Sequence, residues 1–339
     1  MRHLPDWLRR QRAQQLVNLG RARIVAATSF GDAIETAHPE SPFHVVPGAY
    51  VAGRPAVFSR ALDPPFDIIE ESVGYPGQRG MVKRFLREDL RAARVQALDS
   101  AICLGPQPHI YDSFWHWMHE ALVQAVLAEE IGFTGVYIVP SQSYARETLM
   151  QIGVAPERIV VHAGQLWKVA RLYVAPHVAG GRLLHYPEVL GRVRAAMMRK
   201  VTPRKARDRV YISRNRPNVP RQIVNETEFK GLIGKFGFRE YFCEDHSIAE
   251  QVEFFTGCEA AIGSHGAGFT NTLYMPERSL VVPLYPPMRQ ESGGSLVEAR
   301  LLRHRFYPVL PYTHAGYAHG DDVVANLDLI EVILERELS

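Results

Sequence analysis

Short apolar runs and segments with helical periodicity alternate along most of the chain, and the alternation is most regular in the second half. Four apolar runs there predict strands at 209–213, 238–242, 259–263 and 279–284. The segments between the first three runs open with Asn225 and Ser247, and each has a glutamate three positions later. That spacing is typical of a capping box and predicts the start of a helix. The alternation predicts a parallel, doubly wound α/β sheet of the Rossmann type.

The first half alternates in the same way, although less regularly. The pattern predicts strands at 101–104, 136–139, 158–161 and 172–175, and helices at 113–130, 144–152 and 187–200. Residues 201–208 are charged and contain a proline, as linkers often do. A chain of 339 residues exceeds the size of most single cores, so we expect two Rossmann-like domains, 1–200 and 201–339. A terminal helix at 321–338 is expected to pack across their boundary.

The N-terminal part carries two local predictions. Residues 1–18 mix tryptophan and leucine with several arginines, which predicts a short amphipathic helix that packs at the protein surface. The runs 43–46 and 49–52 are separated by Pro47-Gly48, which predicts a β-hairpin.

Composition is that of an ordinary globular protein, with 46% apolar and 22% charged residues. Lys plus Arg number 39 against 36 Asp plus Glu, and the arginines are dispersed, so nucleic-acid binding is not indicated. The cysteines Cys103, Cys243 and Cys258 are widely spaced and form no Cys-x-x-Cys pair. They predict reduced, buried thiols in place of a disulfide framework or a zinc site.

The N-terminus is polar and charged at 9–15, where a signal peptide would have its apolar core, and no apolar run reaches membrane-spanning length. We therefore expect a cytoplasmic protein that associates with a membrane only through a partner.

Residues 260–274 have the most distinctive pattern, because an apolar run breaks into small residues and resumes with helical spacing. The break is Gly263-Ser264-His265-Gly266-Ala267-Gly268, which predicts a tight turn between a strand and a helix. Backbone N–H groups at a helix start are unpaired, and glycines let an anion approach them closely. This glycine turn therefore predicts a phosphate-binding site.

Other interpretations of the glycine turn stay open. The glycines could serve only to make the turn, with His265 as a capping or packing residue. A dinucleotide fingerprint would need glycine where Asn271 stands, and the strand at 279–284 is not followed by an acidic residue. A hydrolase would need Gly-x-Ser-x-Gly, and Ser264 is out of register with that motif by one position.

The helix expected at 113–130 carries a second candidate. His116, Glu120 and Gln124 step by four along the side opposite its apolar stripe, so a histidine and a carboxylate lie one turn apart. Such a pair is often simply solvated. Trp115 and Trp117 flank the histidine, however, and tryptophans are unusual on a surface without a function.

Several short motifs follow one another in order: His116-Trp117-Met118-His119-Glu120, Val210-Tyr211-Ile212-Ser213-Arg214, Asn225-Glu226, Glu250-Gln251-Val252 and Gly263-Ser264-His265-Gly266-Ala267-Gly268-Phe269-Thr270-Asn271. This set resembles the motif set of glycosyltransferase family 61, whose bacterial members include capsular polysaccharide biosynthesis proteins. The resemblance runs from about 111 to 284. Two departures lie on the first helix, where His119 replaces an apolar residue and 121–124 replace a Leu-Pro-Arg-like sequence.

The resemblance implies a GT-B-like fold, in which two Rossmann-like domains face a cleft, with the acceptor side in 1–200 and the donor site in 201–339. It implies inverting, metal-independent transfer of a sugar from a nucleotide-sugar donor to a glycan hydroxyl, in surface or capsular polysaccharide synthesis. The expected acceptor is an oligosaccharide or a lipid-linked glycan, and no cofactor other than the donor substrate is expected.

On the donor side, we expect Arg214 and the backbone N–H groups of Gly266, Ala267 and Gly268 to hold the diphosphate. An arginine supplies a permanent charge and a planar donor fork, which suits a departing diphosphate in a chain without an Asp-x-Asp motif. A surface ion pair is the alternative role for Arg214. The other donor-side candidates are Asn225, Glu226, Ser264, His265 and Asn271. For Asn225, a helix cap is an equally good interpretation.

On the acceptor side, we expect His116 to be the general base, with Glu120 orienting it or serving as base in its place. Imidazole suits this role because it titrates close to neutral pH. Two other classes of function stay open: a nucleotide- or glycan-binding module without catalysis, and a transferase that moves a non-sugar group such as pyruvate.

Overall fold

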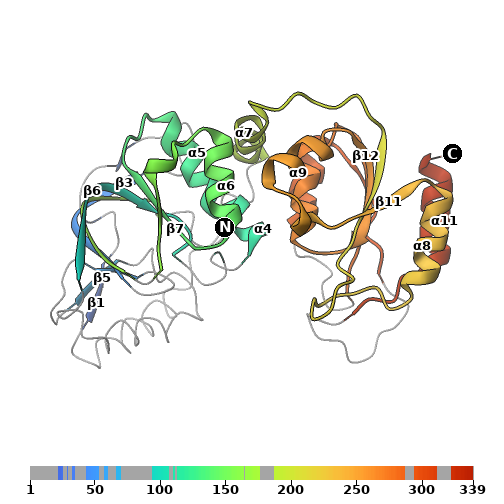
Figure 1. Ribbon diagram of the computed structural model, residues 1–339, viewed down its shortest axis with the longest axis horizontal. Helices are drawn as coiled ribbons and strands as arrows, with labels where there is room; N and C mark the ends of the chain where they lie inside the picture. The colour runs from blue at the N-terminus through green and yellow to red at the C-terminus, as the bar shows by residue number, and fades with distance from the viewer. Residues whose placement is uncertain are drawn as a thin grey trace. The chain divides into compact units, whose positions relative to one another are not determined.

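The computed structural model describes residues 22–25, 29, 33–34, 43–52, 57–59, 66–69, 94–106, 110, 113–163, 165–175, 187–286, 294–310 and 322–338 (Figure 1). The chain divides into two compact units, Met1–Val189 and Leu190–Ser339, and the division falls within α7 (Pro187–Met198). The domain boundary predicted after residue 200, and the packing of the terminal helix across it, stay predictions. The helix predicted at 1–18 lies outside the described residues.

The strands described in the second unit form one parallel sheet. They are β10 (Asp208–Ile212), β11 (Phe238–Tyr241), β12 (Cys258–Ser264), β13 (Leu280–Leu284) and β14 (Arg305–Phe306). Their spatial order is β11-β10-β12-β13-β14, and every neighbouring pair is parallel. The sequence predicts the first four strands to within one residue at each end and misses the short edge strand β14.

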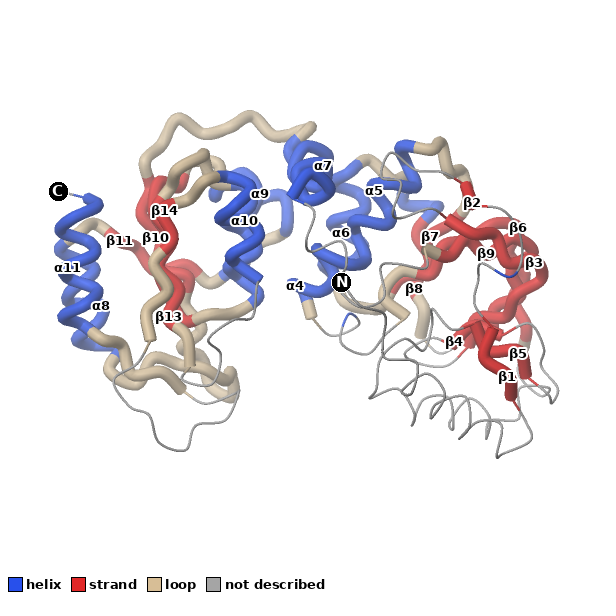
Figure 2. The backbone as a smooth tube through the Cα atoms, turned by 180° about the vertical axis from the view of Figure 1, so that it is seen from behind, coloured by secondary structure: helices blue, strands red, loops and turns tan. Residues whose placement is uncertain are grey.

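Helices cover both faces of this sheet. α8 (Glu226–Lys235) and α11 (Leu327–Leu338) pack side by side on one face. The other face is covered by α9 (Ile248–Phe255), the 3₁₀ helix η8 (Ala267–Tyr274) and α10 (Gly294–Leu302). Figures 1 and 2 show the sheet between these two layers. The doubly wound sheet predicted for this half of the chain is confirmed.

The main core of the second unit lies between the sheet and the α8–α11 layer. Its members are buried aromatic and aliphatic side chains that include Tyr211, Phe229, Ile262, Val282 and Ile330. Burial of such side chains supplies most of the stability of a layered domain.

Two predicted helix caps in this unit have different outcomes. The capping box at Ser247 is confirmed, since its hydroxyl accepts from Glu250 N and the Glu250 carboxylate accepts from Ser247 N. The helix start predicted near Asn225 is also confirmed, since α8 begins at Glu226, but the capping bond predicted for the Asn225 side chain is wrong, because that side chain makes no bond to the helix. Its amide binds the main chain of Ala325 instead, donating to the carbonyl at 3.0 Å and accepting from the N–H at 2.8 Å.

The terminal helix begins at Leu327, later than the predicted 321. The residues before it run beside the segment that precedes α8: Val323 N donates to Gln222 O at 2.7 Å, and Val224 N donates to Val323 O at 2.9 Å. This extended backbone pairing is incompatible with an earlier helix start. Asn326 then caps the helix by accepting from Leu329 N.

In the first unit, one mixed sheet has the strand order β1-β5-β4-β3-β9-β6-β7-β8 among the described residues, with β2 beside β3. Its strands are β1 (Ala22–Val25), β2 (Ala33–Ile34), β3 (Phe43–Ala52), β4 (Val57–Ser59), β5 (Phe66–Ile69), β6 (Val95–Cys103), β7 (Val136–Val139), β8 (Ile159–Val161) and β9 (Leu166–Val174). β9, β6, β7 and β8 are parallel neighbours, whereas β3 runs antiparallel to β9 and to β4. The prediction of a parallel sheet therefore holds for one part of this sheet and is wrong for the part built on β3.

The crossover helices of the first unit share one face. α5 (Leu122–Glu130) connects β6 to β7, and α6 (Ser143–Ile152) connects β7 to β8, so both connections progress in the same direction. Right-handed crossovers in one direction lie on one side of a sheet, and α5 and α6 are in contact. The described part of this unit is therefore wound on a single face. As predicted, Gly153 ends α6, in a left-handed conformation.

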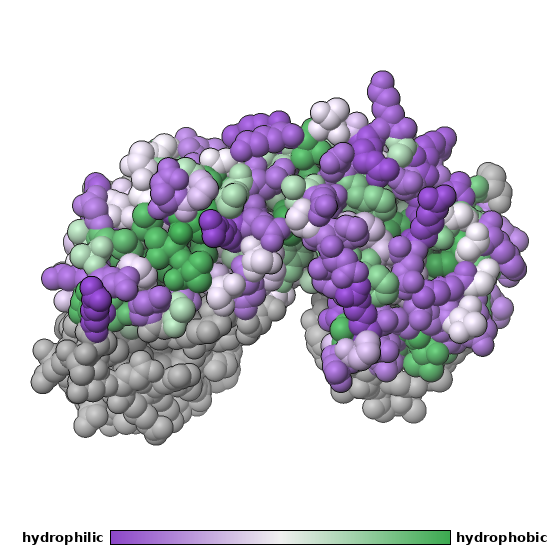
Figure 3. All heavy atoms as spheres, in the orientation of Figure 1, coloured by the Kyte–Doolittle hydropathy of each residue, from purple (hydrophilic) through white to green (hydrophobic). Residues whose placement is uncertain are grey.

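The opposite face of this sheet carries its own apolar cluster, which includes Val46, Val51, Ala101, Ile138 and Trp167. Figure 3 shows hydrophobic residues gathered over the first unit, whereas the visible face of the second unit is mainly hydrophilic.

The predicted hairpin around Pro47-Gly48 is wrong, because β3 is one strand of ten residues. It pairs with β9 on both sides of the dipeptide, from His44 opposite Val174 to Val51 opposite Trp167. Gly48 adopts a positive φ of 64° inside the strand, a conformation that glycine adopts without steric cost. Pairing with a distant strand thus overrides the local turn signal.

Candidate functional site

The carboxyl ends of β10 and β12 form a topological switch point. The two strands are neighbours, but the chain continues from β10 to β11 on one side and from β12 to β13 on the other. Ligands of open α/β sheets bind at the carboxyl ends of strands where the order reverses in this way. Arg214 follows β10, and His265 and Gly266 follow β12. The fold therefore brings two of the predicted motifs to one edge of the sheet.

Each glycine of the glycine turn has a close neighbour that a Cβ would meet. Gly263 has a φ of 155°, and a Cβ there would overlap the carbonyl oxygen of Ile212. At Gly268 a Cβ would lie 2.9 Å from Ile212 Cγ2 and 3.2 Å from Cys243 Sγ. At Gly266 it would overlap the guanidinium of Arg214. Two glycines thus allow tight packing, and the third makes room for a cation.

Arg214 places its guanidinium directly against the glycine turn. Its Nε donates to the carbonyl of Pro220 at 3.2 Å, which orients the side chain. Burial lowers the pKa of Arg214, and the negative charge of Glu244 opposes that effect only in part. An arginine remains cationic at neutral pH all the same. Among the described residues Arg214 forms no ion pair, so the surface ion-pair role considered from the sequence has no partner in that part of the chain.

The glycine turn also offers backbone and hydroxyl donors. The first hydrogen bond of η8 runs from Phe269 N to Gly266 O, so the N–H groups before Phe269 precede the helical ladder. The hydroxyls of Ser264 and Thr270 are buried and have no hydrogen-bond partner among the described residues. A buried hydroxyl without a partner costs about 1–3 kcal/mol, which makes both groups candidates for binding a ligand. The helix predicted after the turn forms as the 3₁₀ helix η8.

His265 is fixed by three contacts with its surroundings. Its N–H donates to Leu284 O at 2.8 Å, and its carbonyl accepts from Arg221 Nη1 at 2.9 Å. Its ring stacks on Tyr285, with the ring centroids 4.4 Å apart.

Arg221 and Tyr285 are residues that the sequence reasoning missed. Arg221 lies seven positions after Arg214 in the loop that follows β10, and Tyr285 directly follows β13. Both therefore come from the carboxyl ends of the central strands, and that placement could have identified them.

Asn271 is a buried residue of η8 that hydrogen-bonds to the glycine turn. Its Nδ2 donates to Gln251 Oε1 at 2.8 Å and to Gly268 O at 3.2 Å, and it lies 3.5 Å from Cys243 Sγ. The side chain is 1% exposed. Asn271 therefore ties η8 to α9 beneath the turn.

Asn225 and Glu226 have other partners among the described residues. Asn225 binds the main chain of Ala325, as described above. Glu226 accepts from the Tyr211 hydroxyl at 3.0 Å and pairs with Lys230 Nζ at 3.1 Å. These contacts connect the start of α8 to the core and to the C-terminal segment.

The second candidate, on the first unit, lies on a helix that changes its winding. α4 (Phe114–His116) continues into a π-helical segment, η4 (Trp117–Ala121), and then into α5. The sequence predicts one regular helix here, and that prediction is wrong for these five residues. π-Helical segments are rare and often occur at functional sites. All five residues of η4 are buried.

The pair His116–Glu120 forms as the spacing predicts. His116 Nδ1 lies 2.5 Å from Glu120 Oε1. The side chain of His116 is 33% exposed, whereas that of Glu120 is 3% exposed. The Glu120 carboxylate is therefore buried, in contrast to the solvated pair considered from the sequence. The neighbouring His119 is held by Trp115, whose carbonyl lies 2.7 Å from Nδ1 and whose ring stacks on the imidazole. The segment thus presents a half-exposed imidazole backed by a buried carboxylate.

Residues 114–282 match the family described as Glycosyltransferase 61. The matched region begins at α4 and ends within β13, so it includes both candidate sites. The match supports glycosyltransferase family 61 and, with it, glycosyltransferase activity, which implies a nucleotide-sugar donor and a glycan acceptor. Comparison with curated proteins gives no match.

The described part of the chain lacks two features, a membrane-spanning helix and a cluster of metal-ligating side chains. No helix in it combines the length and the apolar character that a membrane span needs. It also contains no group of three or more His, Cys, Asp or Glu side chains placed to hold a metal ion. Cytoplasmic location and metal-independent chemistry stay predictions.

Proposed function

We propose that this protein is an inverting glycosyltransferase with a GT-B-like arrangement of its two units, which transfers a sugar from a nucleotide-sugar donor to a hydroxyl of an oligosaccharide or lipid-linked glycan. The observation that carries the proposal is the guanidinium of Arg214 against Gly266, at the switch point of the second unit. The family match supports the class of reaction.

The donor diphosphate binds at the glycine turn in this proposal. Arg214 and the N–H groups of Gly266, Ala267 and Gly268 bind its oxygens, and the hydroxyls of Ser264 and Thr270 add two short-range donors. These groups are fixed before the substrate arrives, so they stabilise the charge that develops on the leaving diphosphate without reorganising. His265 shapes the same pocket, and Asn271 supports it. Asn225 and Glu226 complete the donor side at the start of α8.

The acceptor hydroxyl is activated by His116 in this proposal. Its imidazole takes the hydroxyl proton while the acceptor oxygen bonds to the anomeric carbon and the bond from that carbon to the diphosphate oxygen breaks. Glu120, which is buried and 2.5 Å from Nδ1, stabilises the imidazolium that forms. Attack from the face opposite the leaving group inverts the anomeric configuration.

Two parts of the proposal, metal independence and the role in polysaccharide synthesis, rest on the sequence. Arg214 supplies the positive charge that a metal ion provides in enzymes with an Asp-x-Asp motif, and the chain lacks that motif. We therefore propose metal-independent transfer. A role in surface or capsular polysaccharide synthesis follows only from the resemblance to family 61.

Arg214→Ala tests the donor site. We expect nucleoside diphosphates to bind about 10–100-fold more weakly by calorimetry, because one charge-assisted contact to phosphate is lost. Arg300→Gln is the matched control, since Arg300 is an exposed arginine on α10. If both variants bind nucleoside diphosphate as tightly as the wild type, the donor site lies elsewhere.

A panel of radiolabelled nucleotide sugars, scored for turnover, tests the reaction class. Transfer or hydrolysis of one donor supports a glycosyltransferase, and the anomeric configuration of the product, measured by NMR, tests inversion. Binding without turnover would instead indicate a non-catalytic module, and turnover only with a non-sugar donor would indicate a different transferase. Loss of activity in EDTA, restored by a divalent cation, would refute the metal-free part.

A further inference from the structure

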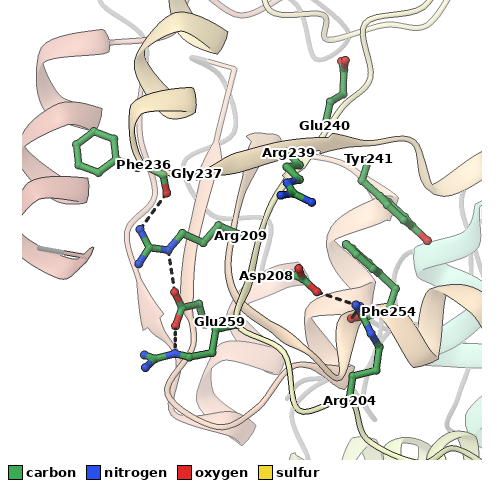
Figure 4. Close-up of a pocket in the computed structure, with 11 residues that line it drawn as sticks. Arg204, Asp208, Arg209, Phe236, Gly237, Arg239, Glu240, Tyr241, Phe254 and Glu259 are labelled. Carbon is green, nitrogen blue, oxygen red and sulfur yellow. Dashed lines mark hydrogen bonds and ion pairs between the residues drawn. The ribbon is translucent and has the colours of Figure 1, made fainter.

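The second unit has a cavity of about 720 Å³ at the edge opposite the glycine turn (Figure 4). Its lining comes from the amino ends of β10 and β12 and from most of the short strand β11, as far as its last residue Tyr241. Arg204 and Arg207 before β10, Phe236 and Gly237 before β11, and Phe254 of α9 complete it. Five residues of β10 span about 16 Å, so Arg207, before its amino end, is well separated from Arg214, after its carboxyl end; Tyr241 of the lining pairs with Ile212 at that carboxyl end. The volume of the cavity is within the usual range for small-ligand sites.

Arginines dominate the charge of the lining. Four of them face three acidic residues: Arg204, Arg207, Arg209 and Arg239 against Asp208, Glu240 and Glu259. This lining therefore carries a net positive charge before any ligand binds. Fields of this kind attract anions, especially where low-dielectric walls surround them.

One carboxylate holds two of the arginines in place. Glu259 accepts from Arg207 Nε at 2.5 Å and from Arg209 Nε at 2.7 Å. Arg209 Nη1 also donates to the carbonyl of Phe236 at 2.9 Å. Both contacts to Glu259 use the Nε side of the guanidinium, so the outer amino groups of Arg207 remain available to a ligand; its side chain is 87% exposed.

Glu259 keeps its charge in this arrangement. Burial acts to raise the pKa of its carboxyl, and the hydrogen bonds from Arg209 and Arg207 outweigh that effect, so the pKa lies below its ordinary value. The carboxylate therefore stays ionised at neutral pH and continues to orient both guanidinium groups.

Arg239 supplies the charge that is not compensated. It is exposed on β11 and makes no hydrogen bond, ion pair or ring contact with any described residue. In Figure 4 its guanidinium lies between Arg209 and Tyr241, with no interaction drawn to it. A cation left unpaired beside a cavity is a natural partner for an incoming anion.

The wall next to Arg239 is aromatic. The rings of Tyr241 and Phe254 stack with their centroids 4.4 Å apart and their planes within 2° of parallel. Arg204 lies over the Phe254 ring at 5.3 Å and pairs with Asp208 at 3.0 Å. The Tyr241 ring also stacks on His246 with the centroids 4.4 Å apart, so its faces are covered and the wall presents ring edges beside the guanidinium groups.

We propose that this cavity binds a phosphate-bearing anion, with Arg239 as its main ligand and Arg207 as a further cation of the lining. A guanidinium binds phosphate through two parallel hydrogen bonds, and a phosphate carries enough charge to use more than one arginine. Either a soluble phosphate ester or the headgroup of an anionic phospholipid would supply this chemistry.

The experiment measures binding of inorganic pyrophosphate and glycerophosphate by calorimetry, to the full-length protein and to Arg239→Gln. Because pyrophosphate also fits the proposed donor site, Arg214→Ala and the double variant are measured as well. We expect two sites in the wild type and in Arg300→Gln. At one of them, Arg239→Gln should weaken binding at least about tenfold while Arg214→Ala leaves it unchanged.

Arg207→Gln is the second variant, since its exposed side chain can be removed while Glu259 keeps Arg209 as a partner. It should also weaken the Arg239-dependent site, and Arg239→Lys should retain part of the affinity. Unchanged melting temperatures would exclude a folding defect. Binding that neither Arg239→Gln nor Arg207→Gln alters would overturn the proposal, and so would the absence of any site other than the one lost in Arg214→Ala.

Vesicles with and without phosphatidylglycerol identify the source of the phosphate. Cosedimentation that requires phosphatidylglycerol and falls in Arg239→Gln would identify a lipid headgroup. Binding of the soluble phosphates alone, with the same dependence on Arg239, would identify a free phosphate ester.

Discussion

The glycine turn of the second unit and the His116 helix of the first unit hold their functional groups in different ways. At the glycine turn the important groups are backbone N–H groups and one arginine, positioned by a regular parallel sheet with Gly263 and Gly266 at points of close contact. On the helix the groups are two side chains, His116 and Glu120, at the junction of an α-helical and a π-helical segment. One site depends on main-chain geometry and the other on side-chain chemistry.

This difference predicts different responses to mutation. At the glycine turn, a change of backbone freedom should reduce stability or ligand binding, because the main chain itself forms the site. On the helix, an isosteric change of one side chain should preserve the fold and reduce the rate of the reaction. Stability and turnover, measured separately for each variant, therefore test whether the two sites differ as described.

The largest effect is expected for Glu120→Gln and His116→Ala. Loss of a positioned base typically lowers turnover by about 10²–10⁴-fold, so we expect a fall of that size at saturating donor. Glutamine keeps the shape of Glu120 and can still contact the imidazole, but it cannot stabilise the imidazolium by charge. Binding of nucleoside diphosphate, measured in parallel, should stay unchanged because it depends on the other unit.

Glu129→Gln is the matched control for these variants. Glu129 lies on the same helix, where it pairs with Arg158 at 2.8 Å and accepts from the Tyr137 hydroxyl at 2.6 Å. Its loss should lower stability and leave turnover close to that of the wild type. Wild-type turnover in both Glu120→Gln and His116→Ala would assign the chemistry to another group.

The next effect is expected for Gly263→Ala. The residue has a φ of 155°, and its Cβ would overlap the carbonyl oxygen of Ile212 in the neighbouring strand. Because neither backbone can move without breaking the sheet, we expect a loss of about 2–4 kcal/mol in the free energy of unfolding, measured with urea. A variant as stable as the wild type would mean that the junction of β10 and β12 is less tightly packed than described here.

The sequence predictions are more accurate for the glycine turn and its sheet than for the His116 helix. The first four strands of the second unit are predicted to within one residue, because parallel strands with helical crossovers leave a strong periodic signal, whereas the two-residue edge strand β14 is missed. The meeting of Arg214 and Gly266 follows from that topology. The π-helical segment was not predictable, since the residues of a π-helix have the same hydrophobic pattern as those of an α-helix over one turn.

Other failures have a common physical cause, which is hydrogen bonding to the main chain of a distant segment. Pro47-Gly48 reads locally as a turn, but β9 pairs with the strand on both sides of it. Asn225 reads locally as a cap, but the main chain of Ala325 binds both ends of its amide. In each case a partner more than 90 positions away decides the outcome, and a local pattern contains no information about it.

A smaller effect is expected for Ser247→Ala, which removes the confirmed capping box. Loss of a serine cap costs about 1 kcal/mol, so urea unfolding should detect a decrease of that size. The hydrogen bonds from the Ser247 side chain and backbone lower the pKa of Glu250. A carboxyl with a lowered pKa in the folded state stabilises the protein above its ordinary pKa of 4.5, and the contribution disappears as the pH falls through the lowered value. The difference between wild type and variant should therefore narrow in acid.

The smallest effect is expected for Gly231→Ala, and its sign is opposite. Gly231 lies exposed inside α8, and a Cβ there would meet no atom within 4 Å. Alanine loses less conformational entropy than glycine when a helix forms, so we expect a gain of about 0.5–1 kcal/mol. Gly237, just after the same helix, also has open space around it, but its φ is 76°. Gly237→Ala should therefore lower stability by about 1 kcal/mol through backbone strain alone. If Gly231→Ala and Gly237→Ala shifted the urea midpoint in the same direction, the difference in φ between these two glycines would not determine the effect of alanine. The stability lost in Gly263→Ala would then have to come from the contact of its Cβ with Ile212 alone.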